Sequence, residues 1–143
     1  MLKQVEQWHN KWCDWLDDFI INAHDATLEF KKPTLEFSSR GGNVAGKYFP
    51  TRNVCRYYLP YPLMLGDRYE ETVMHEVCHS AAHQIFPAAQ WHGDFFHYLT
   101  RVVCGYPNHK TCHNHNVRIV KQYIKQAKLL LLQHQLLLLQ GET

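Results

Sequence analysis

Residues 75–79 read HEVCH, which places two histidines four residues apart with a glutamate beside the first. On a helix, His75 and His79 share one face, so both imidazoles can bind one metal ion. Glu76 lies next to them, where its carboxylate can take a proton from a water molecule at the ion's open position. Catalytic zinc sites use three protein ligands and a water molecule. The HExxH motif therefore supplies two ligands and a base, and a third ligand must come from another segment.

A purely structural role for these three residues is the alternative interpretation. The chain contains 11 histidines among 143 residues. In a chain so rich in histidine, the probability of a chance match to HExxH is roughly a few per cent. The motif lies, however, between apolar residues in a predicted helix. Burying Glu76 and two histidines without partners would cost a core helix much free energy. The pattern therefore favours a metal site.

Several residues after the motif could supply the third ligand. His83 follows on the same helix, but three histidines along one straight helix cannot converge tetrahedrally on an ion. His97 is expected inside the next helix, and Asp94 offers an acidic alternative. His92 precedes that helix, after Pro87 lets the chain turn back. His92 is therefore the favoured third ligand, with Asp94 and His97 kept as alternatives.

The elements that must position these residues follow one another as a helix, a small sheet and further helices. Apolar residues at three- and four-residue steps predict an amphipathic N-terminal helix over 2–23, whose aromatic stripe packs in the core. Strand material is expected at 27–30, 35–37, 44–49 and 54–59, with Pro33 at an edge or a bend. Further helices are expected at 68–86, 93–103 and 117–140. This order predicts an α+β fold with a three-stranded, antiparallel-rich sheet and a long C-terminal helix.

Length and composition predict one domain over 1–143, with a core over about 1–116 and a leucine-rich helix over about 117–140. Five cysteines without a CxxC pair favour a reducing compartment over a disulfide framework. The charged N-terminus lacks the apolar core of a signal peptide, and the leucine runs in KLLLLQHQLLLLQ are too short to span a membrane. We therefore expect a cytoplasmic protein without a membrane partner. A formal net charge of +2 does not by itself indicate nucleic-acid binding.

The segments HEVCHSAAH and QWHGDFF together resemble the SprT-like metallopeptidase family, which includes the Spartan-type proteases. The family pattern is HExxH followed by HGxxF, and His92, Gly93 and Phe96 match the second motif. The segments AGKYFPTRNVCRYYLPYPLM and GYPNHKTCHNH are also similar to stretches of the family, so the resemblance covers about 28–116. The four-cysteine zinc ribbon that follows this core in many members is replaced in the printed sequence by a Leu/Gln-rich segment.

This resemblance implies a small zincin-like metalloprotease domain that acts as a zinc-dependent endopeptidase. It implies one Zn²⁺ per chain on His75, His79 and His92, with Glu76 as the general base that activates water. The substrate would be a protein or peptide, with DNA-bound proteins as candidate substrates in DNA–protein crosslink repair and DNA as a candidate partner. The alternative is a DNA-associated binding or regulatory protein that keeps the zinc-stabilised core with little proteolysis.

Three further groups of residues remain open. A second metal site would draw on Cys104, His109, Cys112, His113 and His115, although their spacing matches no established zinc knuckle. Candidate donors to an oxyanion are Tyr48, Tyr58 and Tyr106. Leucines at 129, 132, 136 and 139 recur at heptad-like steps, which indicates packing on the helical core or, as the alternative, self-association through the C-terminal helix.

Overall fold

The structure is a computed structural model that describes residues 1–24, 27–39, 42–110 and 121–141. The helices are α1 (Leu2–Phe19), α2 (Pro60–Leu65), α3 (Tyr69–Ile85), α4 (Asp94–Tyr98) and α5 (Lys121–Gly141). The strands are β1 (Thr34–Ser38), β2 (Gly46–Phe49) and β3 (Val54–Tyr58). Short π- or 3-10-helical turns follow as η1 (Ile20–His24), η2 (Gly66–Arg68) and η3 (Leu99–Val103). The predicted α+β class is confirmed.

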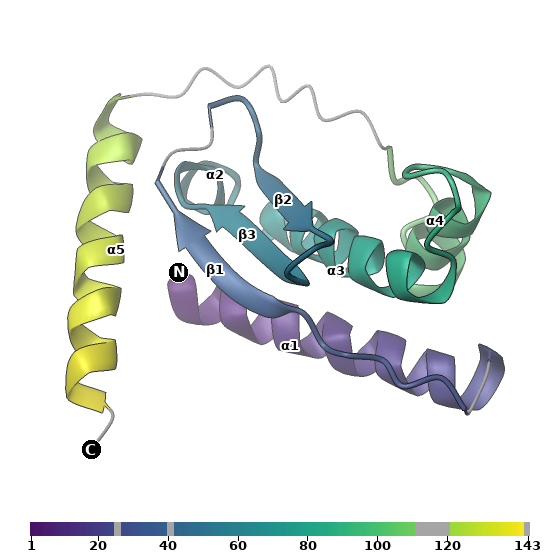
Figure 1. Ribbon diagram of the computed structural model, residues 1–143. Helices are drawn as coiled ribbons and strands as arrows, with labels where there is room; N and C mark the ends of the chain where they lie inside the picture. Colours follow the sequence, from purple (N-terminus) through teal and green to yellow (C-terminus); the bar gives the residue numbers. More distant parts are fainter. Residues whose placement is uncertain (25–26, 40–41, 111–120, 142–143) are drawn as a thin grey trace.

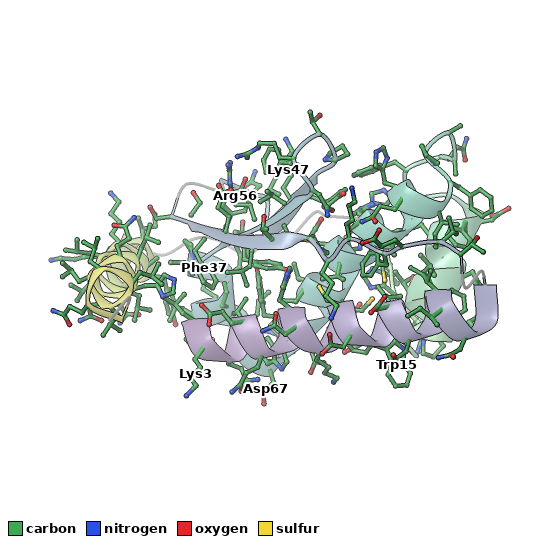
Figure 2. The ribbon with its side chains drawn as sticks, turned by 60° about the horizontal axis from the view of Figure 1, so that its bottom comes forward. Lys3, Trp15, Phe37, Lys47, Arg56 and Asp67 are labelled. Atoms are coloured by element: carbon green, nitrogen blue, oxygen red, sulfur yellow. The ribbon has the colours of Figure 1, made fainter. Side chains whose placement is uncertain are left out.

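The sheet lies over α1 and α3, which pack against each other beneath it (Figures 1 and 2). The predicted aromatic stripe of α1 is buried, with Trp8 and Trp12 both in the core, whereas Trp15 is half exposed. Tyr57 from β3 and Tyr69 from α3 are fully buried between the two layers, 6.2 Å apart between ring centroids. Figure 2 shows Lys47 and Arg56 on the opposite face of the sheet, away from α1. This core holds α3 rigidly under the sheet.

The strand order is β1-β3-β2, with β3 in the centre. The expected antiparallel pairing is found between β2 and β3, but β1 runs parallel to β3. The turn at 50–53 is short, with Asn53 at φ 52°, and it forces the antiparallel hairpin. β2 lies at the sheet edge opposite β1 and runs antiparallel to β3, so β3 lies between them and runs in the direction of β1. One of the two pairings is therefore parallel, because topology rather than local sequence pattern decides strand direction.

The prediction of strand structure at 27–30 is wrong. Residues 28–33 belong to no strand, and the side chains of Asn53 and Gln84 instead bond to the backbone of Lys31. The Lys31 N–H donates to the Gln84 amide oxygen at 2.9 Å, and the Lys31 carbonyl accepts from the Asn53 and Gln84 amides. Regular pairing starts only after Pro33, which has no N–H to donate.

The segments that carry the HExxH and HGxxF motifs match the predicted helices closely, whereas α2, directly after the sheet, was not predicted. Helix α3 spans Tyr69–Ile85, within one residue of the prediction at each end. The helix expected at 93–103 forms as α4 and η3 in succession, and it begins at Asp94. Between them, residues 86–93 turn back towards α3. This return is what brings the second motif to the first.

Helix α5 packs on α2, but not through the predicted stripe. Ala127 is buried in a small cluster with Leu2 and Leu59, which Leu130 and Leu131 border. The heptad-like leucines are instead 50–75% exposed; they are Leu129, Leu132, Leu136 and Leu139. Self-association through that face stays a prediction. Within the described ranges, no helix combines the length and apolar character needed to cross a membrane.

Candidate metal centre

Helix α3 places the two histidines of the HExxH motif on one buried face. His75 and His79 are one turn apart, each at most 3% exposed, and their Nε2 atoms lie 3.1 Å apart. The helix is fixed here because Val73 and Val77, which flank His75 along α3, are fully buried in the core. The apolar residues in and beside the motif thus anchor α3, and the two imidazoles lie close to each other.

His92 joins this pair from the loop before α4. Its Nε2 lies 3.1 Å from Nε2 of His79, and the three ligand atoms lie within 4.8 Å of one another. The loop depends on Gly93. Its N–H donates to the Gln90 carbonyl at 3.1 Å, and a Cβ at this position would lie only 3.0 Å from Gln90 Cβ. Among the described residues, this is the one cluster of at least three possible ligands, and it includes neither His83, His97 nor Asp94.

The donor set fits a zinc ion. Two nitrogens bound to one tetrahedral zinc at about 2.0–2.1 Å lie about 3.3 Å apart, close to the two Nε2 separations of 3.1 Å. Imidazole nitrogen is a common zinc ligand, and three such ligands leave the fourth position open. The cluster can therefore hold a metal ion.

Two aromatic rings hold the His79 imidazole between them. Trp91 stacks on one face with 4.2 Å between centroids and 13° between planes, and Phe96 stacks on the other at 4.3 Å and 21°. Phe96 is 1% exposed and also meets the His75 ring edge-to-face at 4.8 Å. The phenylalanine of the HGxxF motif therefore forms an apolar floor that orients the imidazoles.

Glu76 is buried beside this cluster, under the edge of the sheet. Burial raises the pKa of its carboxyl to about 8, although a hydrogen bond from the Tyr48 backbone opposes the shift. The close approach of β2 requires a glycine, because a Cβ at Gly46 would lie 3.2 Å from Glu76 Cγ and 3.3 Å from Thr72 Cγ2. The site thus combines three imidazoles with a buried carboxyl whose pKa lies near neutral pH in the metal-free protein.

Two pockets meet at Gly46 and Glu76. One, of about 210 Å³, is lined by charged and polar side chains, among them Arg68, Glu71 and His75. The other, of about 530 Å³, has a mostly apolar wall that includes Tyr48, Pro50 and Trp91 as well as His79. Because they share these two lining residues, the pockets adjoin beside the edge strand β2, and we call the two together the groove.

The proposed oxyanion donors are not brought together here. Tyr48 lines the larger pocket, but its hydroxyl donates to Asn53 Oδ1 at 2.7 Å. Tyr58 and Tyr106 line neither pocket at Glu76. The Tyr106 ring instead packs against Trp12, 5.9 Å between centroids. The donor to an oxyanion stays unassigned.

The residues considered for a second metal site lie in different places in the described part of the structure. Cys104 Sγ lies 3.6 Å from Cys78 Sγ in the core, and His109 contacts His75. The remaining members, Cys112, His113 and His115, lie outside the described residues. The four cysteines that the structure describes are free and buried; they are Cys13, Cys55, Cys78 and Cys104.

Two contacts at the site carried no signal in the sequence. The stacking of Trp91 on His79 depends on the path of the loop at 86–93. His109 Nε2 lies 2.7 Å from His75 Nδ1, and this contact depends on the turn after η3. Only the presence of aromatic and imidazole side chains near the motif could have suggested either residue.

In this α+β domain, an HExxH helix under a sheet edge brings its two histidines together with a histidine from an HGxxF segment. The chain belongs to the SprT-like family, whose model matches residues 8–115. It is 36% identical over 99 residues to Protein SprT of Pseudomonas putida and 35% identical to Protein SprT of Pseudomonas entomophila. Each match covers 66% of this chain and 59% of the relative. No solved structure matches the chain significantly.

Proposed function

We propose that this chain is a zinc-dependent endopeptidase of the SprT-like type, with Glu76 as its general base. The observation that carries the proposal is the convergence of three Nε2 atoms beside a buried carboxyl at a sheet edge. A structural metal site has no use for a carboxyl of this kind, whereas hydrolysis needs a base at the metal's open position. The chain spans 59% of the curated relatives that it matches, so activity, substrate and partners are all part of this proposal.

In this proposal His75, His79 and His92 hold the zinc ion, one per chain. The ion supplies Lewis-acid polarisation of a water molecule and of the scissile carbonyl. Glu76 accepts a proton from the attacking water and passes it to the leaving amine. Trp91 and Phe96, which stack on the two faces of the His79 imidazole, keep its orientation fixed during the reaction.

The groove beneath β2 suits an extended peptide. β2 is an edge strand of the sheet, and an edge strand can pair with a peptide through main-chain hydrogen bonds. A peptide laid along this edge passes over Glu76, from the charged pocket to the apolar one. We therefore propose unfolded or extended protein segments as the substrate class. The free buried cysteines support a cytoplasmic location.

The test is a cleavage assay on the zinc-loaded protein. An unstructured protein and a DNA-bound protein are incubated with it, each with and without DNA and with and without a chelator, and fragments are followed by gel electrophoresis and mass spectrometry. We expect fragments that disappear with the chelator and return when zinc is restored. Cleavage only with DNA would assign DNA as an activating partner. Zinc binding without fragments under every condition would reject the peptidase in favour of a binding or regulatory protein.

A further inference from the structure

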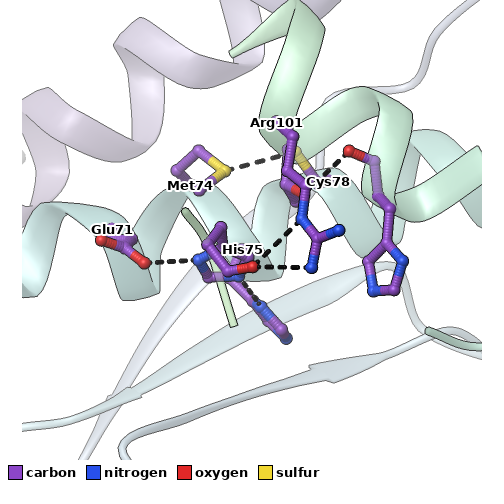
Figure 3. A network of polar contacts seen from close by, with 8 residues as sticks. Glu71, Met74, His75, Cys78 and Arg101 are labelled. Carbon is purple, nitrogen blue, oxygen red and sulfur yellow. Dashed lines mark hydrogen bonds and ion pairs between the residues drawn. The ribbon is translucent and has the colours of Figure 1, made fainter. Parts of the chain in front are cut away.

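We infer that His109 and Glu71 form a positioning relay that sets the tautomer and orientation of the His75 imidazole for metal binding. The inference rests on the proposed function only in assuming that His75 is a ligand. It adds two residues to the site, neither of which belongs to the HExxH or HGxxF motif. Figure 3 shows Glu71 and His75 at the two ends of this line of contacts.

The contacts run in one line behind His75. His109 Nε2 lies 2.7 Å from His75 Nδ1, and His109 Nδ1 lies 2.5 Å from Glu71 Oε2. The His109 imidazole is 5% exposed, so these protein contacts replace the hydrogen bonds it would make in water. His109 touches the Nδ1 side of His75, whereas the cluster is built on Nε2 atoms. His109 is therefore placed as a support for a ligand and not as a further ligand.

Only one arrangement of protons satisfies this line with neutral rings. The ionised Glu71 carboxylate can only accept, so the proton of His109 must be on Nδ1. His109 Nε2 then carries no proton and can only accept, so His75 must donate from Nδ1. The lone pair of His75 is then on Nε2, which lies 3.1 Å from His79 Nε2. This is the tautomer that a metal ion requires of an imidazole ligand bound through Nε2.

The backbone around His109 is held as firmly as its ring. Its N–H donates to the Tyr106 carbonyl at 3.0 Å, and its carbonyl accepts two hydrogen bonds from the Arg101 guanidinium at 3.0 and 3.1 Å. Figure 3 shows this fork from Arg101, which reaches from η3. A forked donor fixes both position and direction of the carbonyl. The loop after η3 therefore presents His109 to His75 in one orientation.

Glu71 completes the relay from α3 itself. It lies one turn before His75, so the helix that carries the ligand also carries the carboxylate that holds its support. His109, from the loop, bridges the two positions. Metal-bound histidines commonly donate their second N–H to such a partner, and loss of the partner costs about 10–100-fold in metal affinity.

The test measures zinc affinity, which does not depend on cleavage. The zinc dissociation constants of the full chain and its variants are obtained by competition with a chromophoric chelator, and Co²⁺ absorption spectra report the ligand geometry. His109→Leu removes both ring nitrogens, and His109→Gln returns an oxygen that can accept from His75 Nδ1–H. His83→Leu, on α3 but outside the cluster, is the matched control. Melting of each metal-free variant shows whether the fold is kept.

We expect His109→Leu to weaken zinc binding about 10–100-fold and to alter the Co²⁺ spectrum. His109→Gln should recover most of the affinity, Glu71→Ala should lose several-fold, and His83→Leu should match the wild type. A merely structural role predicts equal losses for the Leu and Gln variants that follow the melting of the metal-free protein. That outcome, or wild-type affinity in His109→Leu, overturns the inference.

The same measurements separate this inference from the proposed function. A wild-type chain that binds no zinc overturns both. The expected series of zinc affinities in a chain that cleaves nothing keeps the relay and rejects the peptidase. Wild-type affinity in His109→Leu together with zinc-dependent cleavage rejects the relay and keeps the peptidase.

Discussion

Gly46 on β2 lies directly against Glu76 on α3. A Cβ at residue 46 would lie 3.2 Å from Glu76 Cγ, closer than packed side chains normally tolerate. The absence of a side chain at this one position therefore lets the edge strand approach the carboxyl. The groove for a peptide and the position of the base depend on the same residue.

Gly46→Ala is expected to lower both stability and cleavage. The added methyl group must displace Glu76 or Thr72, which costs about 1 kcal/mol in the free energy of unfolding. Denaturant unfolding and the cleavage assay measure the two effects. Thr51→Ala, in the exposed turn after β2 and outside both pockets, is the control. Unchanged stability and activity in Gly46→Ala would show that the contact with Glu76 is not constrained.

Glu76→Gln is expected to abolish cleavage while zinc content stays near one per chain. The amide keeps the shape of the carboxyl but cannot accept the proton of the attacking water. Elemental analysis gives the zinc content, and gel electrophoresis gives the fragments. Glu29→Gln, on the exposed segment before β1, controls for loss of a carboxylate elsewhere. Full activity in Glu76→Gln would reject the general-base role.

His92→Ala is expected to weaken zinc binding by more than the about 10–100-fold that loss of an outer support costs. The reason is that its Nε2 is one of three converging atoms. His97→Ala and His83→Ala should bind zinc as the wild type does, because neither imidazole belongs to the cluster. Competition with a chromophoric chelator measures all three. Stronger loss in His97→Ala than in His92→Ala would transfer the third-ligand role to His97.

Trp91→Ala is expected to weaken zinc binding about 2–10-fold. The indole stacks on His79, and an aromatic pair contributes about 0.5–1.5 kcal/mol. Trp91→Phe should restore part of this loss, because a smaller ring still stacks. Phe86→Ala, in the same loop but against Phe95, is the control. Equal zinc affinity in Trp91→Ala and wild type would show that Phe96 alone orients His79.

The raised pKa of Glu76 predicts how the metal-free protein responds to pH. Folding raises this pKa from 4.5 to about 8, so the unfolded chain releases the proton first as pH rises. Stability is therefore lost between about pH 4.5 and 8, by up to about 1.4 kcal/mol per pH unit, and the full penalty is present above pH 8.

Comparison with Glu76→Gln isolates this effect, because the histidine titrations are common to both proteins. Urea unfolding of both metal-free proteins from pH 5 to 9 should give a difference in stability that grows with pH in favour of the variant. A constant difference across this range would contradict the raised pKa.

Much of the fold was predictable from local patterns. The steps of apolar residues in α1, and Gly66 and Pro87 on either side of α3, placed both helices within a few residues. The strand expected at 27–30 failed because its backbone is satisfied by Asn53 and Gln84, which lie far away in the sequence. The parallel direction of β1 could not be predicted for a similar reason, since it depends on the order of the strands in the finished sheet.

The sequence by itself determined the residues capable of the chemistry. The four-residue step of His75 and His79 guarantees a shared helix face in any fold that keeps the helix. A composite pattern of HExxH and HGxxF made His92 the favoured partner, and its imidazole does join the other two.

Only the tertiary structure decided what surrounds them. Trp91 stacks on His79, and His109 Nε2 contacts His75 Nδ1. The missing side chain at Gly46 leaves room for Glu76 at the sheet edge. These contacts join segments whose separation along the chain carries no periodic signal, because packing of the whole core sets their distances. Helical periodicity is local and readable from one segment, whereas the support of a site is assembled from several.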